Sequence, residues 1–341
     1  MKLWHLSLIL VLTSLIQAEP KAPLAPEERT NGTRTLAAVD AVTRHLKTSV
    51  ALILGDKDRP LATATWVGAD GYFLAKASDT PLLEYSKIRY GDNQTAAIRE
   101  IHRNVALDLV LAQAVGVTGV KPIRFDSKPQ PTAYGQWLTS PAKAGQQIKI
   151  GVVSAQRRRI PGDGAAIGVR MDEEPIRGGG VRVVGIAEDS PAAVAGLRKD
   201  DVLLELAGEK ISQFQRVHEI IRQRQPGELV EVKCRRGVVN LTLQVRLASR
   251  SKILQNWEGE DFANGGISIR TDNFPQIIQH DIPLSPLDMG SPLLDLAGNP
   301  LGINIARVDR VTTFALPAEI FWKEIQPLIE ADRHPPKALK P

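Results

Sequence analysis

The chain has 341 residues, of which 43% are hydrophobic and 24% charged, and its formal net charge is +5. This length and composition exclude a disordered or fibrous protein and predict a globular one with two or three domains. The positive charge is spread along the chain, and no stripe of Lys and Arg is interleaved with aromatic residues. We therefore expect no nucleic-acid partner.

The N-terminal residues predict export. Lys2 precedes the short apolar run LWHLSLILVLTSLI, and Ala18 stands before a Pro-rich polar segment. This order is typical of a secretory signal peptide, here residues 1–18, although Ile16 fits the cleavage site poorly and an uncleaved anchor is the alternative. We expect the mature chain to have no membrane span and to be periplasmic or secreted. Residues 19–35 predict a disordered lead-in.

Two series of short strand candidates follow. The first contains SVALILG, LATATWVG, GYFLAKA, KIRYG, TAAIREIH and DLVLAQA, separated by Gly, Asp and Pro. The second contains GQWLTSPA and QIKIGVVSAQ and resumes much later with FPQIIQHD, SPLLDL, PLGINIAR and TTFALPA. Closely spaced short strands with turn residues predict a barrel or a sandwich. The chain ends with an amphipathic helix that begins at Pro317 and with a frayed tail, residues 332–341.

A module of another kind, residues 163–248, interrupts the second series. In the stretch GGGVRVVGIAEDSPAAVAGLRKDDVLLELAGEKI, apolar and polar residues alternate at both ends, which predicts strands. The Ala-rich middle part predicts a short helix. SQFQRVHEIIRQRQPGE predicts a helix, and LVEVKCRRGVVNLTLQVRL predicts a hairpin, so the module is a compact α+β unit. The single cysteine, Cys234, lies in this hairpin; we expect it to be a structural thiol, since no second cysteine and no activating partner is evident.

The stretch GIAEDSPAAVAGLRKDDVLLELAGEKI resembles the PDZ domains of HtrA-type proteases. This resemblance implies that the module binds an extended peptide or a protein C-terminus along a sheet edge. The family's carboxylate-binding loop falls on AAIGVRM, which implies a role for the backbone N–H groups of Ile167, Gly168 and Val169. Val217 and His218 would line the other wall from the next helix, although such a histidine is more often an ordinary surface residue.

The flanking stretches WVGADGYFLAKAS, NVALDLVLAQ, GQQIKIGVVSAQ and FPQIIQHDIPLSPLDMGSPLLDLAGNPLGINIA resemble the trypsin-like domain of the same family. We therefore expect a mostly β chain: a trypsin-like double β-barrel, residues 36–160 and 249–331, with the PDZ domain inserted. The family usually places its PDZ domain after the protease domain, so the insertion is a departure. A domain can be inserted in a surface loop when its ends lie close together.

The resemblance places the catalytic triad at Ser78, Asp108 and Met289, where the family has His, Asp and Ser. A serine hydroxyl is not basic enough to act as general base, and a thioether cannot form an acyl-enzyme. Loss of either the Ser or the His lowers turnover by about 10⁶-fold. We therefore predict that the chain is proteolytically inactive, and that Ser78 donates a hydrogen bond to the buried Asp108, which needs a partner.

Two further functions stay open at this point. An active serine endopeptidase would need a displaced site, with Ser291 as nucleophile and His280 or His102 as base, although surface or structural imidazoles are the simpler interpretation. The chain could instead be a structural subunit of an active protease or a homo-oligomer, and relatives with this resemblance often form trimers. The sequence has no HExxH motif and no Cys pair, so we expect no metal and no cofactor. The function predicted first is peptide binding as a scaffold, chaperone-like holder or regulator.

Overall fold

The computed structural model describes residues 24–40, 44, 46–81, 83, 86–162, 164–174, 176, 178–250, 253 and 266–334. The predicted signal peptide lies outside the described residues. Within them, no helix combines the length and the apolar character needed to cross a membrane.

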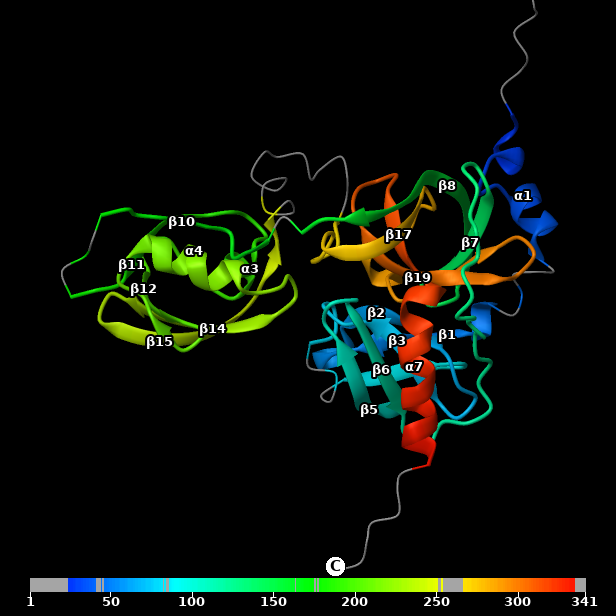
Figure 1. The fold of residues 1–341 in the computed structure, drawn as a ribbon, viewed down its shortest axis with the longest axis horizontal. Helices are drawn as coiled ribbons and strands as arrows, with labels where there is room; N and C mark the ends of the chain where they lie inside the picture. Colours follow the sequence, from blue (N-terminus) through cyan, green and yellow to red (C-terminus); the bar gives the residue numbers. More distant parts are fainter. Residues whose placement is uncertain are drawn as a thin grey trace, which may run out of the picture.

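Six antiparallel strands form a closed first barrel in the order β1-β2-β3-β6-β5-β4 (Figure 1). Its interior is filled by apolar side chains, among which Trp66 and Phe73 pack edge to face with 5.8 Å between ring centroids. All five residues of β3 are buried, and β3 pairs directly with β6. The strands are β1 Val50–Leu54, β2 Pro60–Trp66, β3 Tyr72–Lys76, β4 Lys87–Tyr90, β5 Gln94–Asn104 and β6 Leu109–Ala114.

The second barrel is closed by strands from both sides of the insertion, in the order β17-β20-β19-β18-β7-β8. Strand β8 pairs directly with β17, with Ala155 opposite Gln279, so the two ends of the insertion start from neighbouring strands. The strands are β7 Trp137–Ala142, β8 Gln147–Ile160, β17 Phe274–His280, β18 Pro292–Asp295, β19 Pro300–Arg307 and β20 Thr313–Pro317. The predicted mostly β chain with two barrels and an inserted α+β domain is confirmed.

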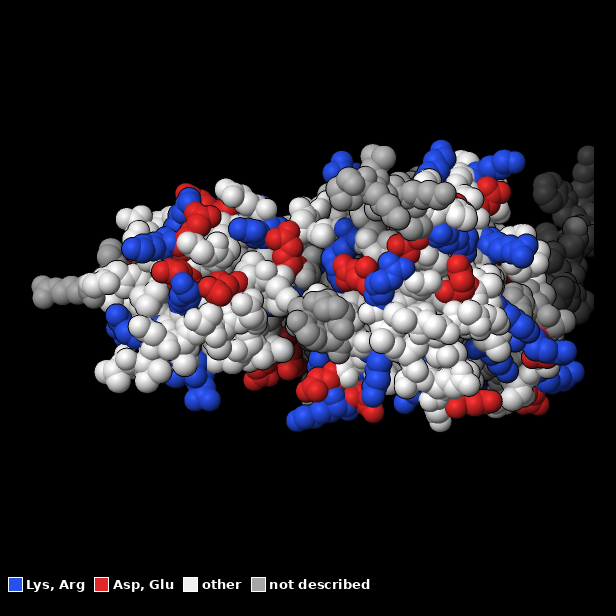
Figure 2. All heavy atoms as spheres, turned by 90° about the horizontal axis from the view of Figure 1, so that it is seen from below, with Lys and Arg blue, Asp and Glu red and all other residues white. Residues whose placement is uncertain are grey.

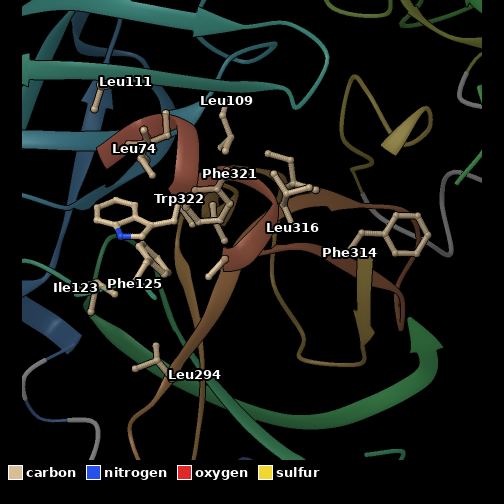
Figure 3. Close-up of a cluster of buried hydrophobic side chains, with 14 of the residues drawn as sticks. Leu74, Leu109, Leu111, Ile123, Phe125, Leu294, Phe314, Leu316, Phe321 and Trp322 are labelled. Carbon is tan, nitrogen blue, oxygen red and sulfur yellow. The ribbon is translucent and has the colours of Figure 1, made fainter. Parts of the chain in front are cut away.

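Helix α7, Ala318–Arg333, runs across both barrels (Figure 1). Phe321 and Trp322 enter a buried cluster with leucines of β3, β6 and β20 (Figure 3). At the other end of α7, the carboxylate of Asp332 accepts a hydrogen bond of 2.6 Å from the Tyr72 hydroxyl of the first barrel. The helix therefore reaches two residues beyond the predicted start of the tail, because Asp332 and its neighbour are anchored by side chains of the first barrel.

The described part of the predicted lead-in contains two short helices, η1 Pro26–Glu28 and α1 Thr33–Ala38. Between them, the Asn31 amide exchanges two hydrogen bonds with the backbone of Ile150 on β8, at 3.0 and 3.2 Å. This contact ties the segment to the second barrel and explains why it is not a free tail.

The inserted domain is a sheet in the order β10-β11-β12-β14-β15, with α4 packed against it and β10 at an edge. Helix α4 buries Val217, Ile220 and Ile221 at helical spacing, which fixes the face it turns to the sheet. Cys234 is fully buried in this core and burial raises the pKa of its thiol, as expected of a structural cysteine. The elements are β9 Ala165–Ala166, β10 Val169–Met171, β11 Val181–Ile186, α3 Pro191–Val194, β12 Val202–Leu206, β13 Glu209–Lys210, α4 Phe214–Arg222, β14 Leu229–Arg236, β15 Val239–Arg246 and β16 Ala248–Ser249.

Charged side chains of both signs are mixed on the face of the molecule that Figure 2 shows. Neither the barrels nor the inserted domain carries a continuous field of one sign on that face. The site that follows is therefore defined by individual contacts rather than by a broad charged surface.

Candidate functional site

The pairing of β3 with β6 brings two of the three triad positions together. Ser78 lies two residues after β3, and Asp108 lies immediately before β6. The Ser78 backbone N–H donates to Asp108 Oδ1 at 2.7 Å, and its hydroxyl donates to Oδ2 at 2.9 Å. Asp108 is only 2% exposed. The predicted hydrogen bond is confirmed, and the carboxylate is turned into the protein.

A lysine that sequence reasoning missed completes this group. Lys76 is fully buried at the end of β3, its Nζ lies 2.6 Å from Asp108 Oδ2, and it also contacts the Ser78 hydroxyl. A buried carboxylate is stable only with a counter-charge or enough hydrogen bonds, and Lys76 supplies the charge. Lys76 and Asp108 thus form a buried ion pair that also holds the Ser78 hydroxyl. The signal in the sequence was a lysine that ends an otherwise apolar strand.

The inserted domain lies directly over Ser78. The Arg246 guanidinium at the end of β15 donates to the Ser78 carbonyl at 3.0 Å. Gly227, in the turn before β14, has a φ of +93°, and a Cβ placed there would be only 2.6 Å from the Ser78 Cβ. The two parts enclose a hollow of about 230 Å³, lined by Ala77, Ser78, Pro81, Arg103, Val105, Asp108 and residues 226–229. Only a glycine fits at position 227, because any Cβ there would clash with Ser78.

Met289, at the nucleophile position, belongs to the core of the second barrel. It is fully buried among apolar side chains such as Leu138 and Ile278. Its backbone N–H donates to the Pro286 carbonyl at 3.1 Å, and its carbonyl accepts from the Thr63 N–H at 3.1 Å. In a serine protease the N–H of the nucleophile stabilises the oxyanion. Here that N–H is already bound within the chain.

The displaced site considered from the sequence is a buried polar network. Ser291 and His280 are both fully buried, and the two side chains are joined through Asn304. The Asn304 amide donates to Ser291 Oγ at 2.9 Å and to Ser140 Oγ at 2.8 Å, while its oxygen lies 2.8 Å from His280 Nε2. The network satisfies its own polar groups, as buried polar groups require.

The partners of His280 assign its tautomer. The Ile282 backbone N–H points at His280 Nδ1, which must therefore be the acceptor, and Nε2 carries the proton that it donates to Asn304. Burial lowers the pKa of His280 to about 4, against a smaller opposing effect of the hydrogen bond with Asn304. Neither ring nitrogen of His280 is directed at Ser291 Oγ. The other candidate base, His102, lies on β5 and forms a half-exposed pair with Glu324 of α7 at 2.9 Å.

The five residues predicted to bind a peptide meet in one groove of the inserted domain. Ile167, Gly168, Val169, Val217 and His218 all line a largely apolar groove of about 370 Å³ between β10 and α4. The edge position of β10 leaves one side of that strand without a partner strand in the sheet. An extended peptide can add to such an edge by main-chain hydrogen bonds.

Hydrogen bonds to two carbonyls fix the loop at the end of the groove. The carbonyl of Ile167 accepts from the Ala192 N–H at 2.9 Å, and that of Gly168 accepts from the Ala187 N–H at 3.0 Å. Gly168 has a φ of +79°, and a Cβ there would lie 2.3 Å from the Ser190 Cβ, so only glycine fits. Within the described residues, the N–H groups of Ile167 and Gly168 have no acceptor. They are donors available to a carboxylate.

Comparison with known proteins identifies the inserted domain. Residues 165–247 match the family described as PDZ domain. No curated protein matches the chain. Similar solved structures include "HtrA-type protease AlgW with decapeptide", with 14% identity, 62% of this chain and 98% of that chain covered and a TM-score of 0.29. The serine endoprotease from Yersinia pestis has 13% identity, 62% and 97% coverage and a TM-score of 0.30.

At TM-scores this low the superpositions carry no argument, so the fold assignment rests on the strand order of the barrels and on the PDZ match. The chain is a double β-barrel protein with a PDZ domain inserted between β8 and β17. Two β-barrels and an inserted PDZ domain are the combination of domains that the sequence predicts. PDZ domains in general bind peptide C-termini.

Proposed function

We propose that this chain is a proteolytically inactive HtrA-like protein that binds the C-terminal segments of extracytoplasmic proteins through its PDZ domain, as a scaffold, holder or regulator. The observation that carries this proposal is the apolar groove between β10 and α4, with the unpaired N–H groups of Ile167 and Gly168 at one end. Its largely apolar lining suits an extended chain that ends in an aliphatic side chain.

Three features support the proposed inactivity. Ser78 and Asp108 are bound to the buried Lys76 rather than to an imidazole. Met289 supplies no nucleophile and lies in a core. The displaced-site endopeptidase has less support, because Ser291 and His280 are fully buried and joined through Asn304.

Peptide binding is tested with the purified chain and a random library of peptides with free C-termini. We expect the chain to select peptides with an aliphatic last residue. The variant Met171→Lys should no longer bind them, because it places a charge in the groove. The matched control is Val239→Lys, at an exposed hairpin position of the same domain. A library without any selected peptide, or equal loss in both variants, would refute the proposal.

Inactivity is tested by fluorophosphonate labelling and by digestion of an unfolded protein substrate. We expect no adduct and no cleavage by the folded chain. An adduct on Ser78 or Ser291 together with cleavage would establish the endopeptidase instead.

Export is the remaining part of the proposal, and it rests on the apolar run that follows Lys2. The mass of the chain recovered from the extracytoplasmic fraction tests it. Loss of residues 1–18 is the expected result, whereas a full-length chain held in the membrane fraction would favour the uncleaved anchor.

A further inference from the structure

The segment that leaves the PDZ domain returns to the carboxylate-binding end of its groove. The match to the PDZ family ends at residue 247, and β16 follows immediately. Strand β16 pairs with β9, the strand directly before the loop, and the Arg250 N–H then donates to the Gly164 carbonyl at 3.0 Å. The groove is lined by Arg250 and Ile253 as well as by residues of the domain itself. Two lining residues thus come from outside the matched domain.

Ile253 closes the groove beneath the loop. It is 6% exposed and packs against Ala187, Ala248 and Ile269, the last of which belongs to the segment leading into the second barrel. A Cβ on Gly168 would lie 3.6 Å from Ile253 Cδ1, which places this side chain in contact distance of the loop. The apolar floor at the carboxylate end is therefore shared between the domain and the exit segment.

Arg250 is the cation at this end of the groove. Its side chain is exposed, and within the described part of the chain no carboxylate pairs with it. The groove lining contains no Asp or Glu. In the adjoining hollow, which Arg250 also lines, Glu219 is paired with Arg216 at 2.7 Å. The other groove arginine, Arg170, lies across β11 against Gly185.

We propose that the peptide site is composite: the exit segment supplies Arg250 to the ligand's free carboxylate and Ile253 to its last side chain. This inference rests on the proposed function of the same groove. Backbone N–H groups of the loop and the Arg250 guanidinium would bind the carboxylate together, through charge-assisted hydrogen bonds. The ligand class is then a peptide with an unblocked C-terminus and an aliphatic last residue, and internal or amidated segments are disfavoured.

The same residues also join the PDZ domain to the second barrel. Ile253 reaches Ile269, and Ser249 Oγ, next to Arg250, donates to Asp272 Oδ1 at 2.8 Å. A bound peptide would therefore contact the junction between the domains and not the PDZ domain alone.

The test uses the full chain and the tightest peptide from the random library, as its free acid and as its C-terminal amide. Fluorescence anisotropy gives the affinity of each form. We expect Arg250→Gln to weaken binding of the free acid roughly ten- to a hundredfold and to leave the amide unchanged. Ile253→Ala should weaken both forms equally. Arg222→Gln is the matched control, since Arg222 lines only the adjoining hollow.

The outcomes separate the two proposals. If the wild-type chain binds neither form, the proposed function fails and this assignment with it. If the wild type prefers the free acid and Arg250→Gln keeps the same preference, peptide binding stands and the composite site is wrong. Thermal melts of the variants ensure that a loss of binding is not a loss of fold.

Discussion

Polar groups are paired within the protein at the triad positions of the barrels, whereas, among the described residues, backbone N–H groups stay unpaired in the groove of the PDZ domain. At two of the triad positions, Ser78 and Asp108 bind each other and Lys76, and all three side chains are buried. In the groove, the N–H groups at Ile167 and Gly168 have no acceptor among the described residues. Polar groups that are satisfied inside a protein hold the fold together, and those left open are available to a ligand. This difference is the reason why the proposed peptide site is placed in the inserted domain and not in the barrels.

The contact between the two regions strengthens this contrast. The turn at Gly227 and the guanidinium of Arg246 lie against Ser78, so the PDZ domain covers the position predicted for the catalytic histidine. A protease needs that position open to substrate. In this chain the contacts at that position fix the inserted domain against the first barrel.

The largest effect is expected from the buried ion pair. Lys76→Met removes the counter-charge of Asp108, and leaving a buried charge without its partner costs about 3–5 kcal/mol of unfolding free energy. Urea unfolding measures the loss. Adding Asp108→Asn to this variant should recover part of it, because the unpaired charge is then gone and Asn tolerates the φ of +57° found there.

Lys87→Met is the control for this prediction. Lys87 pairs with Asp58 at 2.6 Å, but the two side chains are 45% and 61% exposed. Exposed pairs contribute at most about 1 kcal/mol. Equal losses at positions 76 and 87 would mean that the triad group is not held by a buried charge pair, and the contrast with the groove would disappear.

A smaller effect is expected when the triad is rebuilt by substitution. In Ser78→His/Met289→Ser, the hydroxyl that binds Asp108 and Lys76 is lost, and the serine leaves a cavity in the second barrel. Truncating a buried methionine costs about 2–5 kcal/mol. We expect this loss in urea unfolding and no hydrolysis of an unfolded protein substrate.

Met289→Leu is the matched control, because it conserves volume and should cost less than about 1.5 kcal/mol. Substrate cleavage by the double variant, with a fluorophosphonate adduct on residue 289, would show that the catalytic machinery is intact apart from two side chains.

The sequence predicts the architecture well, because alternation, Gly and Pro spacing and the order of the motifs are local signals. The residues predicted to bind a peptide, Ile167 to Val169, follow from one loop motif, and the structure places them together in the groove. Lys76 could not be predicted, since a lysine that ends a strand is usually solvent-exposed. Arg246 and Arg250 were missed for another reason: their roles depend on which distant segments fold against them.

The smallest effect concerns pH and the buried network around His280. The pKa of His280 is 6.5 in the unfolded chain and about 4 in the folded chain, because burial disfavours the imidazolium. Between these values the unfolded chain binds more protons, so acid favours unfolding. Stability should fall as the pH drops from 6.5 to 4, by up to about 3 kcal/mol for this group.

His280→Gln separates this contribution from that of the carboxylates. Glutamine keeps a donor for Asn304 and has no proton to gain, so the variant should lose less stability than the wild type over the same interval. Asp332, whose pKa the Arg99 and Tyr72 hydrogen bonds lower to about 2, titrates below this window in both chains. The measured quantity is the difference in unfolding free energy between pH 6.5 and pH 4 for each chain. Identical differences would mean that folding does not lower the pKa of His280, and the account of a neutral, buried imidazole bound to Asn304 would be wrong.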